Sequence, residues 1–195
     1  DTYRSLRLLL PLFILLFSLG ACLASRLLFR RISNPFYRDM SNTDYLTQLK
    51  NRNAYQLDIG NRIAGKAQEG TGFILLDLNG LKHVNDTLGH DAGDVYITCV
   101  SKAYLNMRTR EAVMYRIGGD EFVVVMPDAD RDKIQDFMRR FGDMFNREAS
   151  MPEFTFSWGY SIYDPKADAD LYSTCRRADK NMYMRKQQYY KNKNT

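Results

Sequence analysis

Cysteine and histidine are scarce in this chain of 195 residues, which holds three cysteines and two histidines. Cys22, Cys99 and Cys175 lie far apart and form no Cys-x-x-Cys pair, so neither a disulfide framework nor a zinc site is indicated. A reducing compartment is the simpler interpretation. The net charge of +5 is small and scattered. It suits an anionic ligand or lipid headgroups, but it is too weak to indicate a nucleic-acid partner.

Charge is absent from Leu8–Ser25, an apolar stretch of 18 residues. A helix of that length spans roughly 27 Å, close to the hydrocarbon thickness of a bilayer. We therefore predict a transmembrane helix at 8–25, between a short flank at 1–7 and a connector at 26–43. Two arginines precede this stretch and four follow it closely, which predicts that the rest of the chain lies in the cytoplasm.

Two other interpretations of this apolar stretch stay open. It could be a buried helix of a soluble protein, or it could be a signal sequence. Leu19–Cys22 resembles a lipobox, in which Cys22 would be lipidated after cleavage. The apolar character continues past Arg26, where a lipoprotein would carry a polar tether, and this favours the membrane helix. The chain begins with Asp1, so an upstream sensor region is a further expectation.

Alternating apolar periods predict an α+β domain at 44–191, followed by a polar tail at 192–195. Short apolar runs between breakers predict strands at 73–78, 113–117, 122–126 and 154–163. Helical spacing predicts helices at 45–67, 81–88, 91–107, 130–147 and 171–190. Without its peripheral helices, this is the βαββαβ order of a ferredoxin-like fold. It favours an antiparallel sheet with helices packed on one face.

Two carboxylates, Asp120 and Glu121, stand at a glycine turn between two predicted strands. The turn alone indicates only a hairpin with solvated acids. A third carboxylate, Asp77, ends a buried apolar run, where an acid needs a partner or a metal. Because the first strand of a βαββαβ sheet neighbours the hairpin, the three acids can converge. They would form a hard oxygen site suited to Mg²⁺, with a nucleotide triphosphate completing the coordination.

Five blocks of sequence follow the order and spacing of one known pattern. They are 44–52, 77–86, 88–94, 178–186 and the signature Gly118-Gly119-Asp120-Glu121-Phe122. Together they resemble the GGDEF domain of diguanylate cyclases over about 44–191. The resemblance implies a fold similar to nucleotide cyclases and polymerase palms. It also implies a bacterial signalling enzyme that joins two GTP molecules into cyclic di-GMP, releasing pyrophosphate. With the predicted helix at 8–25, we expect this enzyme at the inner membrane.

The resemblance also implies roles for individual residues. Two Mg²⁺ ions, or Mn²⁺, would be held by Asp77, the main-chain carbonyl of Leu78, Asp120 and Glu121. Asp120, Glu121 and Lys82 would be catalytic. The substrate-binding residues would be Asn85, Asp94, Gly80, Leu81, Gly118, Gly119 and Lys186. Asn85 and Asp94 would read guanine, because a carboxylate accepts from the N1–H and the exocyclic amine that adenine does not present.

Each domain would be a half-site with one GTP, so the resemblance implies that catalysis needs a homodimer. Two rival functions remain: a non-catalytic receptor for GTP or cyclic di-GMP on the same fold, and a purely structural membrane module. The structural module leaves the three carboxylates unexplained.

The chain departs from the family pattern at several positions. Asn79 replaces a usual Asp, and Tyr190 stands where many members have a phosphate-binding Arg, which Lys191 could replace. Many members also carry a product-inhibition Arg-x-x-Asp that begins nine residues before the first signature glycine. Thr109 and Ala112 occupy those positions here, so we predict no strong product inhibition through that site.

Overall fold

The computed structural model describes residues 11, 13–26, 42–65 and 68–193, and it divides the chain into two units, 1–41 and 42–195. In the first unit, residues 11 and 13–26 are helical and their side chains are exposed. Within the described residues, no helix is both long enough and apolar enough to cross a membrane. The predicted span at 8–25 includes residues 8–10 and 12, and most of the predicted connector is at 27–41. All of these lie outside the described residues.

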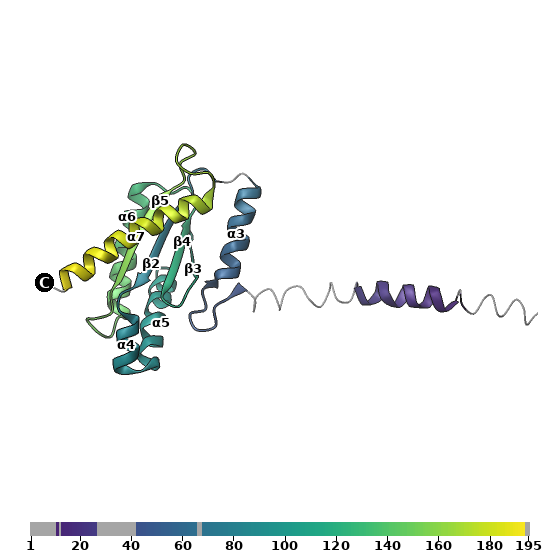
Figure 1. The fold of residues 1–195 in the computed structure, drawn as a ribbon, viewed down its shortest axis with the longest axis horizontal. Coiled ribbons are helices and arrows are strands. Elements are labelled where there is room, and N and C mark those ends of the chain that lie inside the picture. Colours follow the sequence, from purple (N-terminus) through teal and green to yellow (C-terminus); the bar gives the residue numbers. More distant parts are fainter. Residues whose placement is uncertain (1–10, 12, 27–41, 66–67, 194–195) are drawn as a thin grey trace, which may run out of the picture. The chain divides into compact units, whose positions relative to one another are not determined.

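The second unit is built on a five-stranded sheet with the order β1-β3-β4-β2-β5 (Figure 1). The strands are β1 (Lys50–Asn51), β2 (Gly72–Leu78), β3 (Val113–Arg116), β4 (Glu121–Met126) and β5 (Phe156–Ile162). The last four pair antiparallel in the βαββαβ arrangement, whereas β1 pairs parallel with β3. The α+β prediction is confirmed, but the sheet is mixed rather than wholly antiparallel. The added strand has only two residues, too few to show a period in the sequence.

Helices cover both faces of this sheet, so the prediction of helices on one face was wrong. The helices are α3 (Arg52–Ala64), α4 (Leu81–Leu88), α5 (His90–Asn106), α6 (Arg131–Glu148) and α7 (Leu171–Lys193). Even-numbered residues of β2 share a core with α5 and α6, and odd-numbered residues share a second core with α3 and α7. Every residue of β2 is buried, and a strand buried on both faces needs a helix layer on each.

The first helix of this unit begins at Arg52, seven residues later than the predicted start at Tyr45. Local capping explains the difference. The carboxylate of Asp44 accepts hydrogen bonds from the Thr47 backbone and hydroxyl, which closes a turn. The side chain of Asn51 then accepts from the amide of Ala54 and caps the helix. Apolar residues in the turn imitate helical spacing, so periodicity alone could not place the boundary.

Helix α7 packs unusually close to β5. Ser157, Gly159 and Ser161 are small, and they alternate with larger side chains that join the core on the other face. A Cβ on Gly159 would lie 2.1 Å from the backbone nitrogen of Met182, so no other residue fits there without moving the helix. These small residues bring α7 within reach of the strand's own backbone.

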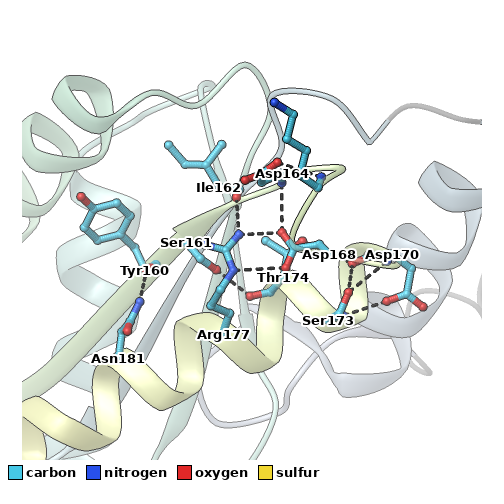
Figure 2. Close-up of polar contacts among 11 residues, drawn as sticks. Tyr160, Ser161, Ile162, Asp164, Asp168, Asp170, Ser173, Thr174, Arg177 and Asn181 are labelled. Atoms are coloured by element: carbon cyan, nitrogen blue, oxygen red, sulfur yellow. Dashed lines mark hydrogen bonds and ion pairs between the residues drawn. The ribbon is translucent and has the colours of Figure 1, made fainter.

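Side chains of α7 cap the exposed edge of β5, an arrangement we call the edge ladder. Arg177 donates to the carbonyl of Ile162, Asn181 to that of Tyr160 and Arg185 to that of Trp158, at 2.7, 2.9 and 3.2 Å. Figure 2 shows the first two contacts. Four residues of a helix rise about 6 Å and two residues of a strand about 6.6 Å, so the two spacings match. The ladder occupies carbonyls that an edge strand would otherwise offer to another chain.

Candidate functional site

The buried carboxylate and the acidic turn lie side by side. Asp77, at the end of β2, pairs in register with Glu121, the first residue of β4, and Asp77 is only 6% exposed. The amide of Leu78 donates to the carbonyl of Asp120 at 3.1 Å, which ties the end of β2 to the turn. Cross-strand neighbours have Cβ atoms roughly 5 Å apart, so the side chains of Asp77 and Glu121 share one face at this edge.

Lys186, from the second half of α7, forms an ion pair with Asp77. Its ammonium lies 2.5 Å from the Asp77 carboxylate, and both side chains are largely buried. Burial raises the pKa of Asp77; Lys186 opposes this shift, and the charges of Asp120 and Glu121 add to it. Burial alone would lower the pKa of Lys186, but the contact with Asp77 outweighs it and the pKa is raised. The carboxylate therefore lies where a positive charge is favoured.

Among the residues that the structure describes, no three His, Cys, Asp or Glu side chains are gathered closely enough to hold a metal ion. The chemistry of the donors nevertheless fits a hard cation. Asp77 is a buried carboxylate beside two further acids, and the Lys186 ammonium stands beside it as a cation would. A metal at this site would be held by Asp77 together with the turn acids Asp120 and Glu121.

The glycine turn is held in place by Arg116, a residue that the sequence interpretation missed. Its guanidinium donates to the carbonyls of Gly118 and Gly119 at 3.2 and 2.9 Å and to the Asp44 carboxylate at 3.0 Å. Burial alone would raise the pKa of Asp44, but hydrogen bonds from Thr47 and Arg116 outweigh it and the pKa is lowered. An arginine at the end of an apolar strand needs such acceptors, and that was the available signal.

The loop from β2 to α4 exposes main-chain amides at the start of a helix. Gly80 has φ 73° and ψ 22°, a left-handed conformation that favours glycine, and it caps α4 without a side-chain hydrogen bond. Leu81 is buried, whereas Lys82 is exposed. Amides at a helix N-terminus bind anions readily, and Lys82 adds a positive charge beside them. The Gly80 amide donates at 3.2 Å to the hydroxyl of Tyr190.

The two residues assigned to guanine lie on adjoining helices. Asn85 is on α4, and its side chain faces Gly93 on α5, where a Cβ would lie 1.8 Å from the Asn85 oxygen. Asp94 follows Gly93 directly and is exposed. The Asn85 oxygen is buried and has no hydrogen-bond partner among the described residues. A buried polar atom without a partner is unfavourable, and a ligand donor would satisfy it.

Asn79 has a structural role in place of the usual Asp. Its side chain donates to the Thr155 hydroxyl at 3.2 Å and accepts from the Ser157 hydroxyl at 2.8 Å. Its carbonyl accepts from the Tyr96 hydroxyl at 3.1 Å. These contacts fix the start of the β2–α4 loop to β5 and α5, and both polar atoms of the Asn79 side chain take part in them.

The structure thus brings most of the predicted site residues into two groups. The first group joins Asp77, Leu78, Asp120, Glu121 and Lys186 around the acidic turn. Gly118 belongs there too, because its Cβ position would lie 2.6 Å from the Glu121 carboxylate, while Gly119 has open space around it. The second group places Asn85 beside Gly93 and Asp94. Lys82 is not joined by a hydrogen bond or ion pair to any described residue.

The fold and this acidic hairpin define a palm-like α+β domain with a mixed five-stranded sheet and flanking helices. The family model of the GGDEF domain, described as diguanylate cyclase, matches residues 41–192. The chain therefore belongs to the GGDEF family. Cyclases of this family generally use divalent metal ions.

Curated relatives are similar over the same domain. The chain is 31% identical over 164 residues to the probable diguanylate cyclase DgcJ of Escherichia coli K12. This match covers 83% of this chain and 32% of DgcJ. It is 30% identical over 152 residues to the diguanylate cyclase DgcN of the same organism, covering 74% and 37%. It is 31% identical over 153 residues to the cyclic di-GMP phosphodiesterase PdeR, covering 77% and 23%. The chain thus spans less than two fifths of these proteins.

Solved structures have the same fold. The coiled coil and GGDEF domain of DgcB from Caulobacter crescentus, in complex with c-di-GMP, has a TM-score of 0.69 and 25% identity, covering 88% of this chain and 94% of that one. The diguanylate cyclase SiaD from Pseudomonas aeruginosa, in complex with its activator SiaC, also has a TM-score of 0.69. Its 23% identity, with coverage of 90% and 70%, supports the fold alone.

Proposed function

We propose that this chain is a diguanylate cyclase that condenses two GTP molecules into cyclic di-GMP and two pyrophosphates. The observation that carries the proposal is the pairing of Asp77 with Glu121, with Leu78 bonded to the backbone of Asp120. This pairing sets a buried carboxylate against an acidic glycine turn, as a triphosphate-binding metal site requires. A structural module would have no use for that arrangement.

Guanine would bind between α4 and α5. The side chain of Asn85, whose oxygen has no partner in the described part of the chain, would hydrogen-bond one edge of the base. The Asp94 carboxylate would accept from N1–H and the exocyclic amine. Adenine presents no such pair of donors, so Asp94 would select GTP over ATP.

The phosphates would lie over the β2–α4 loop. The amides of Gly80 and Leu81 would donate to phosphate oxygens, and Lys82 and Lys186 would balance charge on the leaving pyrophosphate. Mg²⁺ held by Asp77, the Leu78 carbonyl, Asp120 and Glu121 would neutralise phosphate charge and increase the acidity of the attacking hydroxyl. For this to happen, Lys186 must release Asp77 and turn toward the phosphates.

Two such half-sites would face each other in a homodimer. The 3′-oxygen of one GTP attacks the α-phosphorus of the other, the bond to pyrophosphate breaks, and the hydroxyl proton passes to Asp120 or Glu121. The same exchange in the opposite direction closes the ring. The residues contribute mainly by holding the reacting atoms in line.

A receptor that binds GTP or cyclic di-GMP without turnover is the second candidate. Tyr190 in place of the usual phosphate-binding Arg is the observation that favours it. Incubating the chain with GTP and Mg²⁺, and measuring cyclic di-GMP and pyrophosphate by mass spectrometry, separates the two. We expect product from the wild type and none from Asp120→Ala. GTP binding without product would establish the receptor.

We also propose that residues 8–25 anchor the chain in the bacterial inner membrane, with the GGDEF domain in the cytoplasm. Support comes from the apolar residues of the 13–26 helix, such as Phe13, Phe17 and Leu23, which are 69%, 73% and 54% exposed. A helix that is apolar all round needs apolar surroundings. The chain should stay with bacterial membranes after alkaline extraction. Release by that treatment, or fatty-acid labelling lost in Cys22→Ser, would contradict the anchor.

A further inference from the structure

Helix α7 places two side chains, one turn apart, on the two halves of the proposed substrate site. Lys186 binds the Asp77 carboxylate, where a metal would bind, and Tyr190 binds the Gly80 amide, where a phosphate oxygen would bind. Resting on the proposed function, we infer that the Tyr190 hydroxyl is a built-in stand-in for phosphate. GTP must displace it, so Tyr190 sets the affinity for the nucleotide.

The Gly80 contact has the polarity of a phosphate contact. The Gly80 amide is the donor and the Tyr190 hydroxyl oxygen is the acceptor, at 3.2 Å between nitrogen and oxygen. Gly80 is also the residue whose left-handed conformation turns the chain into α4, and its Cβ position meets no atom within 4 Å. The Tyr190 oxygen therefore accepts the hydrogen bond of an amide at a helix N-terminus, a position suited to an anion.

Tyr190 packs against the neighbouring Tyr189 but is itself partly exposed. The rings of Tyr189 and Tyr190 meet edge to face with their centroids 5.3 Å apart. The Tyr189 hydroxyl accepts from the Thr155 hydroxyl at 3.3 Å, which fixes Tyr189 to the segment preceding β5. Tyr190 is 38% exposed, so its ring can rotate into solvent without breaking a packed core.

We expect a triphosphate to displace the Tyr190 hydroxyl from the Gly80 amide, at a measurable cost in binding free energy. A hydrogen bond to a charged oxygen is stronger than one to a neutral hydroxyl, so phosphate replaces the tyrosine at the Gly80 amide. Losing the tyrosine contact costs about what one neutral hydrogen bond contributes, which corresponds to roughly a two- to tenfold change in affinity. Removing the hydroxyl should remove that cost.

The test uses the full chain, Mg²⁺ and 3′-deoxy-GTP, which carries the triphosphate but lacks the attacking hydroxyl. Calorimetry should show Tyr190→Phe binding it about two- to tenfold more tightly than the wild type. Guanosine, which has no phosphate, should bind both proteins equally. Tyr183→Phe is the matched control, because it removes a hydroxyl of the same helix that is exposed and away from Gly80, and it should bind as the wild type does.

Equal affinity of Tyr190→Phe and the wild type for 3′-deoxy-GTP would overturn the stand-in role while leaving the proposed cyclase intact. Weaker binding by Tyr190→Phe would also overturn it, because the hydroxyl would then be a direct phosphate ligand. If neither protein binds 3′-deoxy-GTP at all, the proposed function fails and the stand-in role fails with it.

Discussion

The close approach of α7 to β5 predicts a large effect from the smallest possible substitution. In Gly159→Ala, the new Cβ would lie 2.1 Å from the backbone nitrogen of Met182 and 2.6 Å from its Cα. Non-bonded carbon contacts are relaxed at about 3.5–4.0 Å, so the helix would have to move by more than roughly 1 Å. The atoms in the way are backbone, and no rotation of a side chain can relieve the clash.

The expected cost follows from two contributions. Overpacking a well-filled site costs about 1–3 kcal/mol. A shift of α7 also stretches the edge ladder and the contact of Lys186 with Asp77, and each hydrogen bond contributes about 0.5–1.5 kcal/mol. Since partial relaxation will recover some of this, we expect the free energy of unfolding to fall by about 2–4 kcal/mol.

The single tryptophan, Trp158, makes the assay direct, because it precedes Gly159 and lies 4.3 Å from the Arg185 guanidinium of α7. Its fluorescence during urea unfolding should report the free energy of unfolding, and its fluorescence before unfolding should report whether Arg185 of α7 still contacts Trp158. Gly142→Ala is the control: Gly142 is in α6 and a Cβ there meets nothing within 4 Å. That variant should gain about 0.5–1 kcal/mol. Gly159→Ala unfolding at the wild-type urea concentration would refute the close packing.

Two further predictions concern the base site and acid stability. In Gly93→Ala the new Cβ displaces the Asn85 side chain, which is flexible, so the melting temperature should change little. Calorimetry should show that 3′-deoxy-GTP binds roughly two- to tenfold more weakly. Unchanged affinity would show that Asn85 does not belong to the base site. Burial alone would raise the pKa of Asp168, but hydrogen bonds from Arg177 and the backbone outweigh it and the pKa is lowered. The stabilisation that ionised Asp168 contributes is therefore complete above the pKa of this residue in the unfolded chain, about 4. It is lost as the pH falls through the lower pKa of Asp168 in the folded protein. Asp168→Asn should melt lower than the wild type at pH 7, with a gap that narrows in acid; a constant gap in thermal melts would contradict this.

The sequence predicted the hairpin well, because its signals are local. A run of apolar residues after two glycines leaves few alternatives to a strand–turn–strand, and β4 was misplaced by one residue only. The second helix layer was missed, although the unbroken apolar run of β2 already indicated burial on both faces. The run identifies a buried strand but does not itself say which helices cover each face.

Other features depend on contacts between distant segments, which no local pattern contains. The edge ladder needs the register of β5 against α7, and the Gly80–Tyr190 contact joins residues 110 positions apart. In the sequence, Tyr190 stands out only because it replaces the usual arginine. Its acceptor role becomes visible once α7 is placed against the β2–α4 loop.

The central claim is that Asp77 and the acidic turn hold a metal against a guanine nucleotide. Crystals of the chain grown with Mn²⁺ and 3′-deoxy-GTP would test it through the anomalous signal of manganese. We expect a manganese peak in contact with Asp77 and Asp120, with Lys186 turned toward the phosphates and the base between Asn85 and Asp94. A bound nucleotide with no manganese peak there, and with Lys186 still on Asp77, would contradict the account.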